Sequence, residues 1–125
     1  MNEINETVAT QLPSLANAEA KELAEAIAEV LDSKKGFDIQ VIHVADKTVI
    51  AEYFVLCNGN TSTHIKALVD EVEYKIGMAG IQPTRAEGLH GSSWRVIDYS
   101  SVIVHIFDQE ARDFYKLDKL YTDFE

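Results

Sequence analysis

The segment Asn58–Thr63, NGNTST, has the residue types that could hold a phosphate group. A glycine followed by Ser and Thr, between a strand and a helix, can direct backbone N–H groups at an anion. The segment has neither the lysine of a Walker motif nor GxGxxG spacing, so the pattern is unspecific. The alternative is that Thr61 or Ser62 caps the following helix while Gly59 adopts a positive φ. We favour this capping interpretation, because Ser and Thr are preferred helix caps.

Three acidic residues follow the junction: Asp70, Glu71 and Glu73. A nucleotidyltransferase would use acids on a strand after a Gly-Ser turn to hold two Mg²⁺ ions. Here the acids fall within a predicted helix, where their side chains point in different directions and do not converge on a metal. We therefore expect no catalytic residue, no metal and no cofactor. A nucleotidyltransferase-like, nucleotide-binding enzyme remains the alternative function.

Histidine and cysteine could also serve catalysis or metal binding. The four histidines lack the spacings typical of metal sites: His43, His64, His90 and His105. We expect His105 to be a packing residue with satisfied hydrogen bonds, and His64 to lie on the surface. Cys57 ends an apolar run with no base nearby in sequence, which favours a buried, unreactive thiol.

Aromatic residues late in the chain are better candidates for function. Trp94 follows a glycine-containing segment, and Tyr115 and Tyr121 lie in the C-terminal run FYKLDKLYTDF. Half-buried aromatics are frequent anchors of protein interfaces, so a binding module is favoured over an enzyme. Three other apolar residues of that region are expected to close the bottom of the sheet: Phe114, Leu117 and Leu120.

Acidic and aromatic residues around a predicted hairpin complete the candidate interface. Asp98 and Tyr99 fall at the far end of the hairpin, where we expect side chains to be least covered. Glu87 offers a carboxylate to a lysine or arginine of a basic partner. The predicted partner-binding residues are Glu87, Trp94, Asp98, Tyr99, Tyr115 and Tyr121.

Hydrophobic periodicity predicts eight elements that would position these residues, in the order α-β-β-α-β-β-β-α. The predicted ranges are a helix from Asn17 or Ser14 to about Lys35, a hairpin of strands 37–44 and 49–57, a helix at 63–79, a short edge strand at 81–86, strands 94–98 and 102–107, and a helix at 109–116. Gly36 is expected to end the first helix, and Asp108 to cap the last one. Strand 102–107 is apolar on both faces, which predicts a central position. The fold class is α/β, with helices packed on a mixed sheet.

Composition restricts the class of protein. At 125 residues the chain is long enough for one domain, and no apolar run approaches the roughly 20 residues of a membrane span. The N-terminus lacks the pattern of a signal peptide. One cysteine fits a reducing cytosol, and we expect a cytoplasmic protein. The net charge of −10 disfavours a broad phosphate-binding surface and suits a basic protein partner.

Three sequence blocks carry a resemblance to a known family. They are AEYFVLCNGNTSTHIKAL, EG-x-x-G-x-x-W-x-x-x-DYSSVIVHIF and EARDFYKLDKLYTD, in this order. Over roughly residues 18–123 the chain resembles the Iojap-like family, the ribosomal silencing factors S. Glu52 stands where the family usually has Asp, and Ser100-Ser101 replaces its usual Gly-Asp turn. Residues 1–17 are expected to form a flexible N-terminal segment, and residues 18–125 the domain.

The resemblance implies a translational repressor that binds the large ribosomal subunit through its protein uL14. It implies that the bound factor blocks association with the small subunit, with a further part in large-subunit assembly. The implied fold is similar to that of nucleotidyltransferases, without their catalytic acids. Self-association into a homodimer is left open, and we expect no membrane association and little direct contact with nucleic acid.

Overall fold

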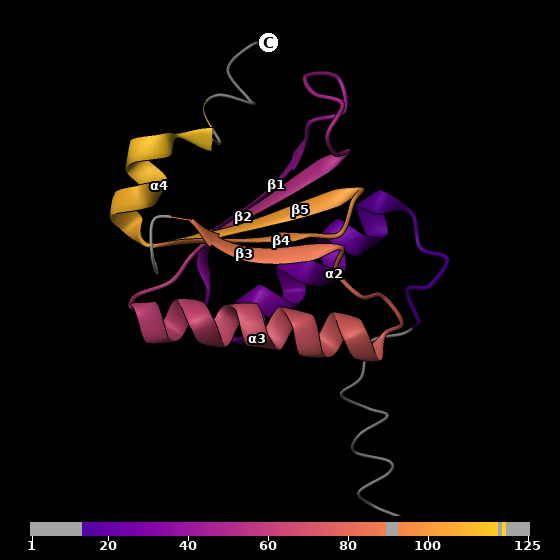
Figure 1. Cartoon of the computed structure of the whole chain (residues 1–125), viewed down its shortest axis with the longest axis horizontal. Coiled ribbons are helices and arrows are strands. Elements are labelled where there is room, and N and C mark those ends of the chain that lie inside the picture. Colours follow the sequence, from indigo (N-terminus) through magenta and orange to yellow (C-terminus); the bar gives the residue numbers. More distant parts are fainter. Residues whose placement is uncertain (1–13, 90–92, 118, 120–125) are drawn as a thin grey trace, which may run out of the picture.

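The computed structural model describes residues 14–89, 93–117 and 119, in which one five-stranded sheet has helices on both faces (Figure 1). The elements are α2 (Ala20–Ser33), β1 (Phe37–His43), β2 (Tyr53–Asn58), α3 (Ser62–Met78), β3 (Arg85–Leu89), β4 (Trp94–Asp98), β5 (Val102–Phe107) and α4 (Gln109–Tyr115). The predicted order of elements and the α/β class are confirmed.

The sheet is mixed, with strand order β1-β2-β5-β4-β3. β5 pairs with β2 in parallel and with β4 antiparallel, and all six residues of β5 are buried. The predicted central position of this strand is confirmed. β3 lies at one edge and pairs only with β4, as expected for an edge strand, although it begins at Arg85 and so follows Pro83.

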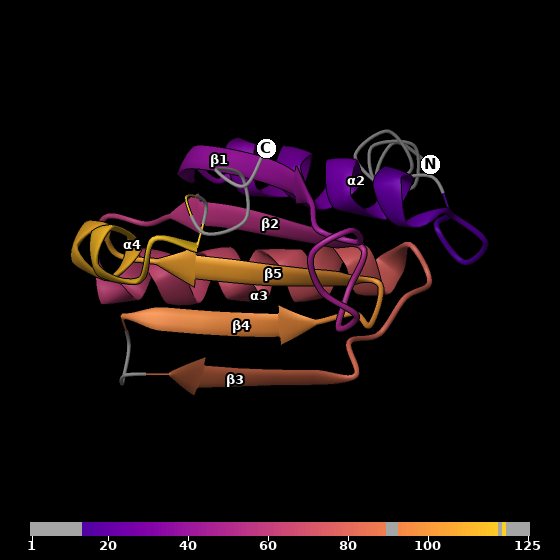
Figure 2. The ribbon, with the colours of Figure 1, turned by 90° about the horizontal axis from the view of Figure 1, so that it is seen from above.

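Alternation along β5 divides the core in two, because successive side chains of a strand point to opposite faces. Val102, Val104 and Ile106 pack with α2 and α3. Ile103, His105 and Phe107 face the other side, where α4 covers one end of the sheet (Figures 1 and 2). We call this second side of the sheet, which carries His105 and the aromatic residues around it, the open face.

The ends of α2 differ from the prediction. Its N-cap is Glu19, whose backbone N–H donates to Glu22 Oε1 at 3.3 Å, so neither Asn17 nor Ser14 caps it. In this arrangement the side chain of the third helical residue, Glu22, accepts the N–H of the cap residue. A Ser or Asn cap would instead accept N–H groups of the first helical turn. Before α2, Leu15 is buried and its N–H donates to Ala79 O, just after the end of α3, at 2.8 Å.

Gly36 does not end α2 in the expected way. The left-handed residue is Lys35, with φ 67°, and the N–H of Gly36 donates to Leu31 O at 2.9 Å, as in a Schellman motif. Gly36 is needed for another reason, since a Cβ there would collide with Cys57 Sγ. The prediction located the end of the helix but assigned the wrong role to its glycine.

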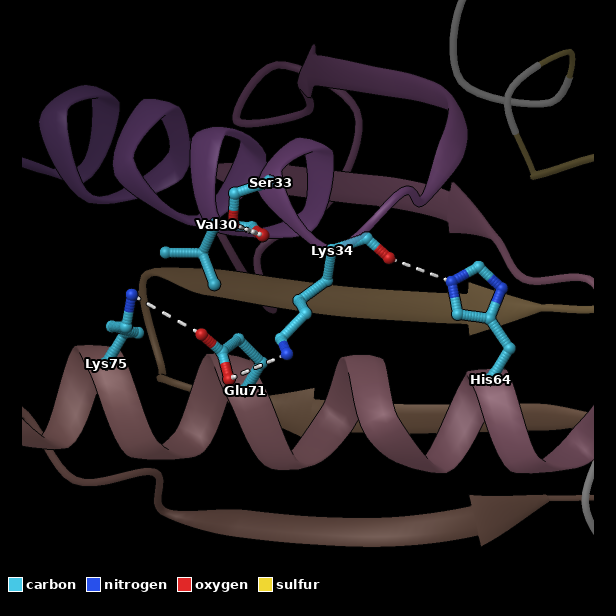
Figure 3. A network of polar contacts seen from close by, with 6 residues as sticks. All are labelled: Val30, Ser33, Lys34, His64, Glu71 and Lys75. Atoms are coloured by element: carbon cyan, nitrogen blue, oxygen red, sulfur yellow. Dashed lines mark hydrogen bonds and ion pairs between the residues drawn. The ribbon is translucent and has the colours of Figure 1, made fainter.

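Side chains from α3 fasten it to the end of α2 (Figure 3). The half-buried His64 accepts a hydrogen bond at Nδ1 from the N–H of Asn60, at 3.0 Å, and its Nε2 lies 2.9 Å from Lys34 O. Glu71 Oε2 lies 3.4 Å from Lys75 Nζ, and Oε1 lies 4.0 Å from Lys34 Nζ. His64 is therefore a link between helices, which its predicted surface position did not reveal.

The connection between β1 and β2 is longer than predicted, because β2 begins at Tyr53 and not at residue 49. The predicted antiparallel pairing of the two strands is confirmed. Val44 N–H donates to Glu52 O at 2.8 Å and closes the loop between them. Val49 is fully exposed in this loop and Ile50 is 59% exposed, so β-branched residues predicted to be sheet residues project into solvent.

Candidate functional site

The Asn58–Thr63 junction caps a helix. Thr61 Oγ1 accepts the N–H of His64 at 3.0 Å, which confirms the predicted cap. The expected positive φ at Gly59 is wrong: a Cβ there would lie 2.8 Å from Ile65 Cγ1, so glycine permits close packing. Within the described residues, the junction has the geometry of an ordinary helix start.

The acids of α3 lie apart, as their sequence spacing predicted. Asp70 Oδ2 lies 3.0 Å from Lys66 Nζ, whereas Glu71 pairs with Lys75 on another side of the helix. Across the part of the chain that the structure describes, no group of three His, Cys, Asp or Glu residues could hold a metal ion.

Trp94 lies at the centre of an aromatic cluster on the open face. Its half-buried ring stacks on Phe107, with ring centroids 5.3 Å apart, and contacts Tyr115 with centroids 4.5 Å apart. Trp94 Nε1 donates to His105 Nδ1 at 3.1 Å. The ring thus packs partly against the core and keeps part of its surface accessible.

α4 positions Tyr115 beside Trp94. Asp108 caps this helix as predicted, with Oδ1 accepting the N–H of Ala111 at 2.8 Å. The buried Arg112 donates from Nη1 to Asn58 Oδ1 at 2.7 Å. Two side chains from distant parts of the sequence therefore hold the helix against the end of β2.

The residues expected to close the bottom of the sheet do not all do so. Phe114 is 75% exposed and lies edge-on to Tyr115, so its predicted burial is wrong. The ring lies on the outer side of a helix of only seven residues, of which Ala111 and Arg112 are the buried ones. Leu117 is partly buried on the open face. Leu120 and the predicted interface residue Tyr121 lie outside the described residues.

The end of the hairpin places its two predicted interface residues on opposite faces. Asp98 is half-buried, accepts the N–H of Ser100 at Oδ1 (2.7 Å) and lies 3.7 Å from Arg85 Nη2. Tyr99 is only 6% exposed and packs in the core beside the helices. Burial is the main reason that the pKa of Tyr99 is raised, with the charge of Glu73 second. The expectation that Tyr99 is uncovered is therefore wrong, because its strand position points it at the helices.

Glu87 lies on the edge strand β3, where it is exposed and pairs across the sheet with Val96. Together with Asp98, Arg85 and the loop residue Ile50 it borders a cavity of about 200 Å³ on the open face. The remaining lining residues are Phe54, Val96, Ile103 and His105. The cavity thus has apolar walls and a charged rim.

His105 is the residue whose role the sequence did not reveal. It is 8% exposed, and burial lowers the pKa of its imidazole to about 4. Its Nε2 has no hydrogen-bond partner among the described residues, so the expectation of a fully satisfied histidine is wrong for this atom. The available signal was a single polar residue in the apolar run VIVHIF, on the same face as the tryptophan.

Cys57 is buried, as predicted, and burial raises the pKa of its thiol to about 12. A thiol with this pKa has almost no thiolate at neutral pH, which makes it a poor nucleophile.

Among the described helices, none is both long and apolar enough to span a membrane.

A family model described as "Ribosomal silencing factor during starvation" matches residues 17–125. The chain is 30% identical to the ribosomal silencing factor of Bacillus subtilis over 103 residues, covering 82% of this chain and 87% of that protein. It is 34% identical to the factor of Haemophilus influenzae over 100 residues, covering 80% of this chain and 98% of that protein.

Similarity extends to a eukaryotic protein and to a solved structure. Mouse "Mitochondrial assembly of ribosomal large subunit protein 1" is 29% identical over 99 residues, which cover 77% of this chain and 43% of that protein. A crystal structure of a Chromobacterium violaceum protein has a TM-score of 0.78 at 27% identity, covering 82% of this chain and 86% of that one.

Proposed function

The chain belongs to the family of ribosomal silencing factors, and on this premise we propose that it represses translation by binding the large ribosomal subunit. The proposed contact is the ribosomal protein uL14, and the bound factor keeps the small subunit from joining. Inhibition is then steric and proportional to occupancy, with no substrate turned over. The name of the mouse relative supports the large subunit as the partner.

The observation that carries this proposal is the open face of the sheet. α2 and α3 cover the opposite face, whereas α4 leaves Trp94 and Tyr115 half-buried, and an apolar cavity with Glu87 and Asp98 at its rim opens on the same side of the sheet. Aromatic side chains that are partly covered and held rigidly are the usual anchors of a protein interface. We therefore propose Trp94, Tyr115, Glu87 and Asp98 as docking residues, with Tyr121 as a candidate beyond the described residues, and omit the buried Tyr99.

Charge supports a basic protein as the partner. The chain carries 21 acidic and 11 basic residues, and the exposed Glu87 borders the proposed docking surface. Such a surface attracts lysine and arginine side chains and repels the phosphates of ribosomal RNA. The proposal accordingly includes little direct contact with nucleic acid and a cytoplasmic site of action.

Sedimentation with separated ribosomal subunits tests the proposal. We expect the protein to sediment with large subunits alone and, when bound, to reduce the formation of joined ribosomes in a light-scattering assay. Neither effect should require a nucleotide. Binding to neither subunit would contradict the proposal, and nucleotide transfer by the pure protein would favour the enzyme alternative.

Two further parts of the proposal concern assembly and self-association. A factor on the large subunit would also be placed to act during its assembly, as the mouse protein's name states for that protein. A homodimer formed through the same open face would compete with docking. Analytical ultracentrifugation with and without large subunits separates the two associations.

A further inference from the structure

The direction of the backbone groups of β3 follows from the hydrogen bonds of its neighbour β4. At one end of the β4–β5 pair Tyr99 N–H donates to Val102 O at 2.9 Å, and at the other end Asp108 N–H donates to Ser93 O at 3.0 Å. Because backbone groups alternate in direction along an antiparallel strand, the odd-numbered residues of β4 bond to β5. The even-numbered residues bond to β3: Trp94, Val96 and Asp98.

Two residues of β3 consequently direct their backbone groups away from the sheet. The even-numbered residues of β4 pair with Leu89, Glu87 and Arg85. The N–H and C=O groups of Ala86 and Gly88 therefore point outward. In Figure 2 β3 forms the outer border of the sheet, and no other described element runs along its free side. A row of unpaired donors and acceptors on a strand is a template for pairing with another chain.

β3 is more regular than β1, the strand at the other edge of the sheet. The register of β1 with β2 shifts between Phe37 and Gln40, and Asp38 has a φ of 51°, so the edge of β1 is interrupted. β3 pairs with β4 without a shift along its whole length, and Pro83 precedes the strand instead of lying within it. Bulges and prolines protect many edge strands from pairing. Neither protects β3, so its backbone can accept an additional strand.

The groove beside this edge carries an excess of negative charge. It has a volume of about 230 Å³ and lies between α3 and the two strands β3 and β4. Asp70 and Glu73 of α3 and Glu87 of β3 line it, and Arg95 is the one cation among its described lining residues. Asp70 already pairs with Lys66. Alternate side chains of an added strand would point towards this groove, and its charge favours lysine or arginine among them.

A second copy of this chain fits the edge poorly. Antiparallel pairing of two β3 strands that uses the outward groups of Ala86 and Gly88 in both copies places the two Glu87 residues directly opposite each other. Like charges in that position are destabilising. Each copy also carries a net charge of −10, which adds a general repulsion between copies. The charges therefore favour a basic chain over a copy of this one.

We propose that β3 binds an extended, basic segment of the docked large-subunit protein as an additional strand of the sheet. Ala86 and Gly88 bond to the main chain of this segment, and its lysine or arginine side chains lie beside Glu73 and Glu87. This inference rests on the proposed function, because it names the structural form in which that partner is bound. It extends the docking surface around the edge of the sheet, since Glu87 borders both this groove and the open-face cavity.

A proline in β3 tests the added strand. Ala86→Pro removes an outward N–H and places the proline ring where the added strand would lie, while the groups that bond to β4 are kept. Ala86→Ser keeps the N–H and is the matched control. We expect Ala86→Pro to bind purified large subunits about tenfold more weakly, and Ala86→Ser to bind them like the unaltered protein.

Glu73→Lys tests the charge of the groove without changing β3. We expect about tenfold weaker binding of large subunits at low salt and a smaller loss at high salt, because salt screens the lost attraction. Stronger binding would indicate ribosomal RNA beside the groove and would overturn the inference.

The outcomes separate this inference from the proposed function. Failure of the unaltered protein to bind large subunits would contradict the proposed function. If the unaltered protein binds, normal binding by a folded Ala86→Pro overturns the inference alone. If Ala86→Pro does not fold, normal binding by Glu73→Lys at low salt overturns it. Loss of a dimer of the free protein in Ala86→Pro, with normal subunit binding, would identify a second copy as the occupant and also overturn it.

Discussion

Arg112 Nη1 donates to Asn58 Oδ1 at 2.7 Å, and both side chains are buried although 54 residues separate them in sequence. Asn58 also donates from Nδ2 to Gln109 Oε1 at 2.9 Å, so a single amide at the end of β2 holds two residues of α4. The position of Tyr115, and through it the environment of Trp94, depends on this link.

Replacing Arg112 with Met should therefore loosen α4. We expect a loss of about 2–3 kcal/mol in the free energy of unfolding, because a buried amide oxygen loses a charged donor. Trp94 is the only tryptophan, so its fluorescence should shift to the red as Tyr115 withdraws. Lys66→Met, on an exposed part of α3, is the control for lost charge. An unchanged emission spectrum would show that other contacts hold the helix.

Replacing Lys35 with Gly should stabilise the protein. Lys35 has a φ of 67°, which is unfavourable for a residue with a Cβ. We expect the free energy of unfolding, measured by chemical denaturation, to rise by about 1 kcal/mol. Lys34→Gly, one residue earlier at φ −104°, should lower stability instead, since there glycine only adds freedom to the unfolded chain. Equal effects of the two changes on stability would contradict the left-handed conformation of Lys35.

Gly36→Ala should be destabilising by about 2–3 kcal/mol, because the new methyl group would collide with Cys57 Sγ and must displace it. Cys57→Ala makes space for that methyl group. The double variant should therefore be more stable than the sum of the single effects predicts, by about 1 kcal/mol. Additive losses would mean that the nearby carbonyl of Leu31, 3.0 Å from the added carbon, causes the strain.

His105 should make stability depend on pH. Burial lowers the pKa of its imidazole from 6.5 to about 4. Between these values the unfolded chain binds more protons than the folded one, so the free energy of unfolding falls as the pH is lowered through this range. The loss is on the order of 3 kcal/mol by pH 4.

The His105→Phe protein is the reference for this measurement. Urea unfolding at a series of pH values should give a shallower slope between pH 6.5 and 4 for the variant. Glu87 and Asp98 near the cavity rim are present in both proteins, so the difference in slope isolates the histidine. Parallel curves would show that His105 is protonated in the folded protein.

Trp94→Ala should lower both stability and affinity. The ring contacts Phe107, Tyr115 and His105, so we expect a loss of about 3 kcal/mol in folding. Its accessible part should cost at least about 2 kcal/mol in large-subunit binding, measured below the melting temperature. Tyr74→Ala removes an exposed aromatic from α3, on the opposite face of the sheet, and is the control for both measurements. A variant that melts lower yet binds normally while folded would remove Trp94 from the interface.

The sequence predicted the elements well where one signal determined the structure. The unbroken apolar run of β5 was recognised as a central strand because residues covered on both faces are nearly all apolar. Thr61 and Asp108 were recognised as caps because their side chains act on backbone only three residues away. Such local chemistry requires no knowledge of the rest of the fold.

The predictions were wrong where contacts between residues far apart in the sequence determine the local structure. Gly36 and Gly59 were assigned conformational roles, whereas each makes room for a side chain, Cys57 and Ile65 respectively. Tyr99 was expected to be exposed because it ends a hairpin, but alternation along the strand points it at the helices. His105 Nε2 has no partner among the described residues, whereas Nδ1 accepts a hydrogen bond from Trp94, and sequence spacing carries no information on either contact.

The parallel pairing of β2 with β5 has a consequence for the order in which the molecule can form during synthesis. β2 lies between β1 and β5 in the sheet, but α3, β3 and β4 separate it from β5 in the sequence. Until Val102–Phe107 has been synthesised, β2 can therefore pair only with β1. Closing so long a loop must precede the gain from the pairing. A nascent chain that ends before Phe107 therefore exposes the apolar edge of β2, and a truncated product would be a target for chaperones and proteases.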